Sequence, residues 1–324
     1  FRYQKQGPLP APPSAREGIR LVSSLPNSAH RRAIILMIIA PTLWSIAGVV
    51  TRHLSPELQA QGRFEITFWR SVFAAIFVGG FLLVRRDFVG SLRRTGIAGL
   101  MSGAMWAVMF TCFMLALTLT STANTLIVLA VGPLTTALLA RAVLKAPIPP
   151  RTWAAIAIAM VGIGAMFADG LRIESRAAAL GMLVAFAIPL AGSINVVILK
   201  KRGKSIDLIP AVFLGGTISA ALMLPFAWPF TADARDIALL ALLGFFQLGL
   251  PCTLLVIAAR HLSATEVALL ALLEVVLGPL WAWLGAGEAP ASSALFGGAL
   301  VLSALMLNEL VAARRASSAR LTLR

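Results

Sequence analysis

Groups that carry enzyme chemistry are scarce in this chain of 324 residues, which has 13 Asp and Glu, three His, two Cys and one Tyr. The histidines have no neighbouring ligands at the spacing of metal sites, and the sequence lacks a Ser, His and Asp arrangement and a glycine-rich phosphate loop. Cys112 and Cys252 fall in apolar runs, where a free Cys behaves as a small apolar residue. The sequence therefore predicts no catalytic residue, no cofactor and no metal site, and it disfavours an enzyme.

Charged residues as a whole are also few, at 13% of the chain, where a soluble domain has about 25%. The 28 Lys and Arg residues exceed the acids and give a net charge of +15. No basic helix with interleaved aromatic residues lies outside the apolar runs, so we expect no nucleic-acid partner. The excess of positive charge predicts contact with anionic lipid instead.

Long apolar runs dominate the sequence, and 59% of the residues are hydrophobic. A helix needs about 20 apolar residues to cross the hydrocarbon core of a bilayer. The runs do not alternate with period two, which favours helices over a barrel. The sequence predicts an all-α membrane protein with ten transmembrane helices, at about 33–52, 65–84, 96–116, 121–143, 152–168, 177–199, 207–227, 236–258, 263–284 and 292–312.

Basic residues alternate along the connections between these runs. They gather in the amino-terminal tail, in every even-numbered connection and after the last run, as in Arg85–Arg86 and Lys200–Arg202. Short positive segments stay in the cytoplasm. We therefore expect a multi-pass protein of the inner (plasma) membrane with both termini cytoplasmic. Residues 1–32 and 313–324 are predicted to be cytoplasmic tails, the first of them disordered.

The apolar pattern repeats within the chain. Residues 118–168 match 260–310 in hydropathy and length without a gap, and Ser45–Val50 matches Gly192–Val197. The predicted units are 33–168 and 177–312, with five helices each, and an odd number forces opposite orientations. The connection at 141–151 is basic whereas its counterpart at 283–293 has no Lys or Arg, as inversion requires. Two inverted five-helix repeats are typical of transporters that bind substrate between the repeats and alternate access.

One stretch resembles a known family. Ser263–Glu274, with Trp283 and then Gly287–Glu288, is similar to the second conserved block of the EamA-type branch of the drug/metabolite transporter superfamily. Val275 stands where that block usually has Pro, and Ala146 replaces the acid that would match Glu288. Further similarities lie at Trp44, Phe68–Trp69–Arg70 and Pro133. The resemblance implies a transporter over nearly the whole chain after residue 32.

Within that superfamily, Gly278–Trp283 and the preceding Leu273–Val276 are most similar to YddG-type exporters. This resemblance implies export of aromatic and other neutral amino acids. The partner is then a small molecule, and the surroundings are lipid. A single chain suffices for this function, although the Gly- and Ala-rich helix faces would serve a dimer equally well.

Charged side chains inside the runs are the first candidates for a substrate pathway, because burying a charge in lipid is costly. The candidates are Arg70, Glu266 and Glu274. The two acids are eight residues apart and are expected to share one inward face of the ninth helix. Glu274 is interpreted either as a contact for an amino group or proton, or as an acid bonded to neighbouring helices. Arg70 is interpreted either as snorkelling or structurally paired, or as bound to a substrate carboxylate.

Polar and aromatic residues in mid-run complete the predicted pathway, and they are Trp44, Trp106, Asn195 and Gln247. The amides are equally explained as hydrogen-bonded links between helices. Pro41 and Pro189, in counterpart runs, are predicted hinges, with permanent kinks as the alternative.

The sequence therefore predicts an exporter of small amphipathic metabolites, with amino acids as the first class of substrate. A drug or cation exporter is the alternative, and a membrane-embedded receptor or lipid enzyme is a less favoured one. Neither proton coupling nor its absence can be read from the sequence.

Overall fold

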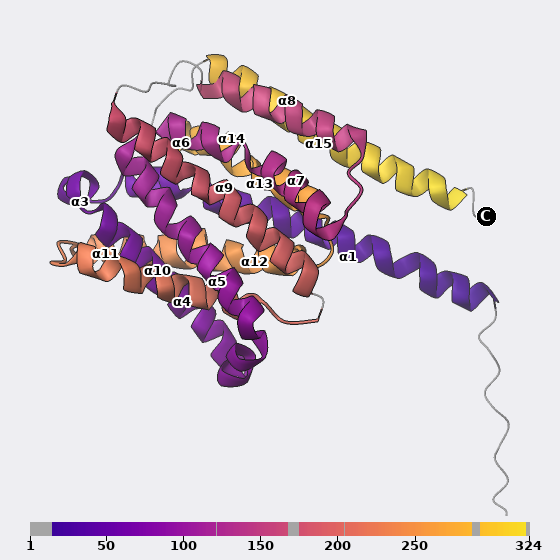
Figure 1. Cartoon of the computed structure of the whole chain (residues 1–324), viewed down its shortest axis with the longest axis horizontal. Helices are drawn as coiled ribbons and strands as arrows, with labels where there is room; N and C mark the ends of the chain where they lie inside the picture. Colours follow the sequence, from indigo (N-terminus) through magenta and orange to yellow (C-terminus); the bar gives the residue numbers. More distant parts are fainter. Residues whose placement is uncertain (1–14, 121, 168–174, 204, 287–291, 322–324) are drawn as a thin grey trace, which may run out of the picture.

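The computed structural model describes residues 15–120, 122–167, 175–203, 205–286 and 292–321. Within these ranges the regular structure is helical (Figure 1). The helices are α1 (Ala15–Trp44), α2 (Ala47–Thr51), α3 (Pro56–Gln61), α4 (Arg63–Val84), α5 (Phe88–Leu119), α6 (Thr122–Leu129), α7 (Gly132–Leu144), α8 (Pro150–Phe167), α9 (Arg176–Arg202), α10 (Ile209–Ala227), α11 (Ala234–Leu242), the π-helix η2 (Leu243–Gly249), α12 (Leu250–Ala258), α13 (Ala264–Ala271), α14 (Leu273–Ala286) and α15 (Ser292–Leu321).

Eight helical segments in the described part of the chain are long and apolar enough to cross a membrane. Two shorter apolar helices, Pro150–Met166 and Leu295–Asn308, fall where the fifth and tenth spans were predicted. The prediction of an all-helical membrane protein is confirmed.

The chain before the first span differs from the expected disordered tail. Helix α1 begins at Ala15 and continues to Trp44, so residues 15–32 are helical. The stretch from Ala15 to Leu21 is rich in Ala, Glu, Arg and Leu, which have high helix propensity. Residues 1–14 lie outside the described part of the chain.

Several predicted spans are interrupted near their middle. The first stops at Trp44 and resumes at Ala47 as α2. The fourth is divided between α6 and α7, and the ninth between α13 and α14. At the last two breaks the backbone tightens to hydrogen bonds between residues three apart. Val131 donates to the Val128 carbonyl (3.1 Å), and Leu272 donates to the Leu269 carbonyl (3.0 Å). Pro133 cannot donate a backbone hydrogen bond, which favours the break before α7.

Small residues allow the helices to approach closely. Helix α10 packs against both α4 and α5, and α9 packs against α5. A Cβ atom on Gly216 of α10 would lie 2.8 Å from the Ser71 carbonyl oxygen of α4. Helices α8 and α15 lie side by side along one edge of the molecule (Figure 1). There, a Cβ atom on Gly162 would lie 2.8 Å from the Gly297 carbonyl oxygen. Such contacts are the usual means of helix association in lipid.

Candidate functional site

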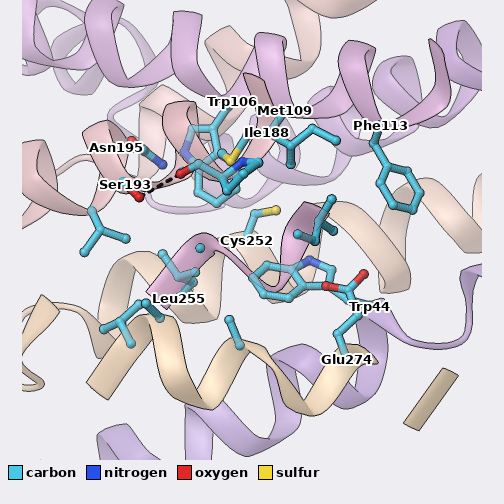
Figure 2. A pocket seen from close by; sticks show the side chains of 18 of the residues that line it. Trp44, Trp106, Met109, Phe113, Ile188, Ser193, Asn195, Cys252, Leu255 and Glu274 are labelled. Carbon is cyan, nitrogen blue, oxygen red and sulfur yellow. Dashed lines mark hydrogen bonds between the residues drawn. The ribbon is translucent and has the colours of Figure 1, made fainter. Parts of the chain in front are cut away.

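A central cavity of about 210 Å³ lies where the interrupted helices meet (Figure 2). Its walls come from α1, α4, α5, α6, α7, α9, η2, α12, α13 and α14, so that both halves of the chain contribute. Six of the seven predicted pathway residues line it, namely Trp44, Arg70, Trp106, Asn195, Gln247 and Glu274. The structure therefore brings together residues that are widely separated in the sequence.

Arg70 of α4 is buried, with 5% of its surface exposed, and it lines the cavity. Its Nη2 donates to Oε1 of Gln247 (2.8 Å), and its Nη1 contacts the sulfur of Met114 (3.0 Å). Its Nε has no hydrogen-bond partner in the part of the chain that the structure describes. Snorkelling to the interface is thus excluded for Arg70, because the guanidinium points into protein and is held there by Gln247.

Gln247 is placed by the π-helix η2. Pro251, four residues later, has no backbone N–H with which to continue an α-helical ladder to the Gln247 carbonyl, which favours a wider turn here. The Gln247 side chain accepts from Arg70, and its Nε2 donates to the carbonyl oxygen of Trp44 (3.2 Å). That carbonyl is at the end of α1, so one amide links the π-helix, the buried arginine and the break in the first span.

Glu274 lies in the first turn of α14 and lines the cavity. Among the described residues, no hydrogen bond or salt bridge to its carboxylate is formed, and the charge that acts on it electrostatically is that of Arg70. Figure 2 shows Glu274 beside Trp44 at one side of the cavity. A carboxylate and a guanidinium that face the same cavity without a direct ion pair leave both charges available to a third molecule.

Glu266 does not belong to this group. It forms a capping box with Ser263 at the start of α13, where the Ser263 amide donates to Oε2 of Glu266 (2.6 Å). Its Oε1 lies 3.7 Å from Nε2 of His30. The expectation that Glu266 and Glu274 share one helix face is wrong, because the helix stops at Leu272 between them. The signal was present, since Ser263 followed three residues later by Glu266 is the sequence of a capping box.

Trp106 and Asn195 line the side of the cavity opposite Glu274 (Figure 2). Oδ1 of Asn195 accepts from the hydroxyl of Ser102 (2.6 Å). The indole nitrogen of Trp106 is buried and has no hydrogen-bond partner among the described residues, and only 3% of the residue is exposed.

The two predicted hinges differ. Pro189 lines the cavity within the continuous helix α9, whereas Pro41 does not line it and lies three residues before the end of α1. The carbonyl of Pro189 accepts from the Ser193 hydroxyl (2.7 Å). Whether either proline bends during transport stays a prediction.

Sequence reasoning missed several apolar cavity residues, including Met109, Phe110 and Phe113 of α5. Together with Trp106 they follow the spacing i, i+3, i+4 and i+7, which places them on one face of a helix. That period was readable, but in a chain where every helix is apolar it does not distinguish a cavity wall from a lipid face. Cys252, also buried in the wall, gave no signal at all. The described residues contain no group of side chains suited to a metal ion.

Comparison with known proteins shows which family the chain belongs to. Two curated relatives, the pseudopaline exporter CntI of two Pseudomonas aeruginosa strains, UCBPP-PA14 and PAO1, are each 25% identical to the chain over 280 residues, which covers 85% of this chain and 94% of theirs. A solved crystal structure shares the fold with a TM-score of 0.74 at 17% identity, over 87% of this chain and 98% of that one. The sequence profile of the EamA-like transporter family matches twice, over residues 31–168 and 179–310. The chain therefore belongs to the EamA-like transporter family and is a multi-pass membrane protein with two copies of the family's unit.

Proposed function

We propose that this transporter exports small zwitterionic metabolites, with aromatic and other neutral amino acids as the first class, by alternating access through the central cavity. One observation carries the proposal, which is that Arg70 and Glu274 face the same aromatic-walled cavity without bonding each other. An α-carboxylate fits the guanidinium of Arg70, and an ammonium group fits the carboxylate of Glu274. The net charge of this pair of side chains is zero, which suits a zwitterion better than an ion of one sign.

The aromatic lining supports an apolar side chain on the substrate. Trp44, Trp106, Phe110 and Phe113 contribute to the wall, and the rings of Trp106 and Phe110 have centroids 5.7 Å apart. Mostly apolar walls with a few fixed polar groups are typical of small-molecule sites. The polar groups then orient the substrate, and the rings supply contact area.

Alternating access requires the two five-helix units to be inverted, and the internal geometry supports that arrangement. The breaks at residues 130–131 and at 272 occur at counterpart positions of the two family units. Ser71 of α4 donates to Ser219 of α10 (3.0 Å), so the second helix of one predicted unit contacts the second helix of the other. Contacts of this kind are those of a pseudo-twofold axis.

This topology is tested by cysteine or reporter tags near residues 146 and 288. We expect the first in the cytoplasm and the second outside, with both termini cytoplasmic in the inner membrane. Labelling of both positions from the same side would overturn the inverted ten-helix arrangement and, with it, alternating access.

Hydrogen bonds hold α1 and α9 to the connection between α12 and α13. Nζ of Lys200 in α9 donates to the carbonyl oxygens of Ala259 (2.9 Å) and Leu262. His30 of α1 lies against both the His261 carbonyl (Nδ1, 3.3 Å) and Glu266. Under the proposed topology, these contacts lie on the cytoplasmic side, because the connections there are basic. They support the proposal of a state that is closed on that side.

Substrate counterflow in liposomes tests the function. Purified protein in vesicles preloaded with unlabelled amino acid is expected to accumulate the labelled compound saturably, while vesicles with an Arg70→Met variant are not. An amino-acid panel without saturable uptake by the intact protein would refute the amino-acid assignment.

A second candidate, export of organic cations or drugs, is favoured by Glu274 alone, because a carboxylate beside tryptophan rings binds cations. The name of the Pseudomonas aeruginosa relatives adds pseudopaline to the compounds to be tried. Under the cation hypothesis, Arg70→Met would leave transport of a quaternary ammonium probe intact while Glu274→Gln abolishes it. The zwitterion hypothesis requires both residues.

A further inference from the structure

The side of the cavity opposite Glu274 carries hydrogen-bond donors that the zwitterion site does not use. Arg70, Gln247, Trp44 and Glu274 are joined through the Gln247 hydrogen bonds and the charge interaction described above. Figure 2 shows Trp106 on the other side of the cavity from Trp44 and Glu274. The cavity therefore has two polar ends with apolar walls between them.

Trp106 supplies the first of these donors. Its Nε1 is buried and has no partner in the described part of the chain, and the side chain lines the cavity. A tryptophan nitrogen can only donate. A buried donor without an acceptor costs about 1–3 kcal/mol, so its position favours a ligand atom that accepts from it.

Asn195 supplies the second donor. Its Oδ1 is occupied by the Ser102 hydroxyl (2.6 Å), which turns the amide group of the side chain away from Ser102. Asn195 also lines the cavity and is only 1% exposed. The fixed carbonyl leaves the NH₂ group as the part of this side chain that is free to bind a substrate. Two donors on one wall, with no charge beside them, suit a neutral or anionic oxygen.

We infer that Trp106 and Asn195 form a second polar subsite that selects substrates with a hydrogen-bond acceptor at the end remote from the amino-acid group. This inference rests on the proposed function, because it presupposes that Arg70 and Glu274 hold the zwitterionic end. It narrows the substrate class from aromatic amino acids in general to those that carry a distal hydroxyl, carbonyl or carboxylate oxygen. A purely apolar side chain would leave both donors buried and unpaired.

Competition by matched aromatic amino acids tests the subsite on the intact protein. L-Tyrosine, L-phenylalanine and 4-methyl-L-phenylalanine are compared as competitors of labelled tyrosine counterflow in liposomes. Tyrosine has the distal acceptor, phenylalanine lacks it, and the methyl compound fills the same space without it. We expect tyrosine to compete about tenfold better than either analogue, as one buried hydrogen bond allows. Equal competition by all three would overturn the inference while leaving amino-acid transport established.

Trp106→Phe then assigns the preference to the indole N–H. The variant keeps an aromatic ring and removes the donor, so the ratio of tyrosine to phenylalanine competition should fall to about unity, whatever the effect on the overall rate. Trp281→Phe is the matched control, because the indole of Trp281 donates to Ser45 Oγ (2.8 Å) and Trp281 does not line the cavity. An unchanged preference in Trp106→Phe, or an equal loss for both amino acids in a variant with normal thermal stability, would contradict the role of Trp106. If Trp106→Phe does not fold, the comparison of the three competitors on the intact protein decides alone. Absence of saturable transport by the intact protein would instead refute the proposed function itself.

Discussion

The two halves of the molecule, residues 31–168 and 179–310, have the same scaffold and different cavity chemistry. Helices α6 and α7 in the first half break at the position where α13 and α14 break in the second. After the break, the first half has Gly132 and Pro133 where the second has Glu274 and Val275, and all four line the cavity. Glu274 of the second half thus occupies the position that Gly132 has in the first half.

The second charged residue of the cavity, Arg70, belongs to the first half, and it too is unmatched in the other half. Arg70 lies in α4, whereas the corresponding helix of the second half, α10, contains no charged residue between Ile209 and Ala227. Each half therefore contributes one charge, and neither charge has a counterpart. Under the proposed function, the duplicated scaffold gives the cavity its shape, while single unmatched residues bind the charged groups of the substrate. Substitutions at matched positions test this division directly.

The largest effect is expected for Arg70→Met against Ile218→Met. Loss of the guanidinium removes the donor to Oε1 of Gln247 and the positive charge near Glu274. Removal of one member of a buried charged network costs about 2–5 kcal/mol. We expect transport to fall by about a hundredfold or more. Ile218→Met is a volume-conserving apolar exchange and should leave transport within about twofold. Initial rates of amino-acid counterflow measure both, and equal losses would show that the two positions are not functionally distinct.

Glu274→Gln against Gly132→Ala comes next. The amide keeps the shape and removes the charge that binds an ammonium group, so we expect a loss of affinity of about tenfold. A Cβ atom on Gly132 would meet Pro189 Cβ at 3.8 Å, which is an ordinary contact, and the alanine should be tolerated. Substrate affinity from the concentration dependence of counterflow separates the two. A Gly132→Ala loss as large as that of Glu274→Gln would mean that cavity shape, not charge, dominates recognition.

Helices α8 and α15, the last helices of the two halves, pack against each other. Comparison of Gly297→Ala with Gly298→Ala in α15 tests this packing. A Cβ atom on Gly297 would overlap the Gly162 carbonyl oxygen of α8 and lie 2.7 Å from the Met166 backbone nitrogen. Overpacking of this kind costs about 1–3 kcal/mol. The nearest atom to a Cβ on Gly298 is Cγ1 of Val276 at 3.5 Å, an ordinary contact. Thermal unfolding in detergent should show a lower midpoint for Gly297→Ala alone.

Much of this comparison was readable in the sequence. Apolar run lengths located the helices, and the repeat located the two units, because both depend only on hydropathy. Six of the seven predicted pathway residues line the cavity, and they were readable because a polar or bulky side chain in mid-run is costly unless it faces a cavity. The breaks at Trp44 and Leu272 were not found, since an interrupted helix keeps the hydropathy of a continuous one. For that reason Glu266 and Glu274 were placed on one face although a turn separates them.

The predicted hinges provide a further comparison across the halves. Pro189 lies within continuous α9 and leaves the Ala185 carbonyl without its helical donor, so Pro189→Ala restores a hydrogen bond and stiffens the helix. Pro41 lies next to a break that already interrupts α1. We expect Pro189→Ala to slow transport severalfold without changing substrate affinity, and Pro41→Ala to have the smaller effect. Unchanged rates in both variants would indicate permanent kinks in place of hinges.

The smallest effects are expected at the serine pair that joins α4 of the first half to α10 of the second. Ser71 donates to Ser219 (3.0 Å), and Ser219 also lies 3.1 Å from the Thr111 hydroxyl. A hydrogen bond between membrane helices contributes about 0.6 kcal/mol, so Ser71→Ala should lower stability by about that amount. Ser219→Ala removes both contacts and should cost about twice as much, while the double variant should cost no more than Ser219→Ala, because the bond that the two serines share is lost only once. Unfolding free energies of the three variants give the coupling directly. If the two single effects simply add, the two serines do not interact, and their contact would no longer support a pseudo-twofold arrangement of α4 and α10.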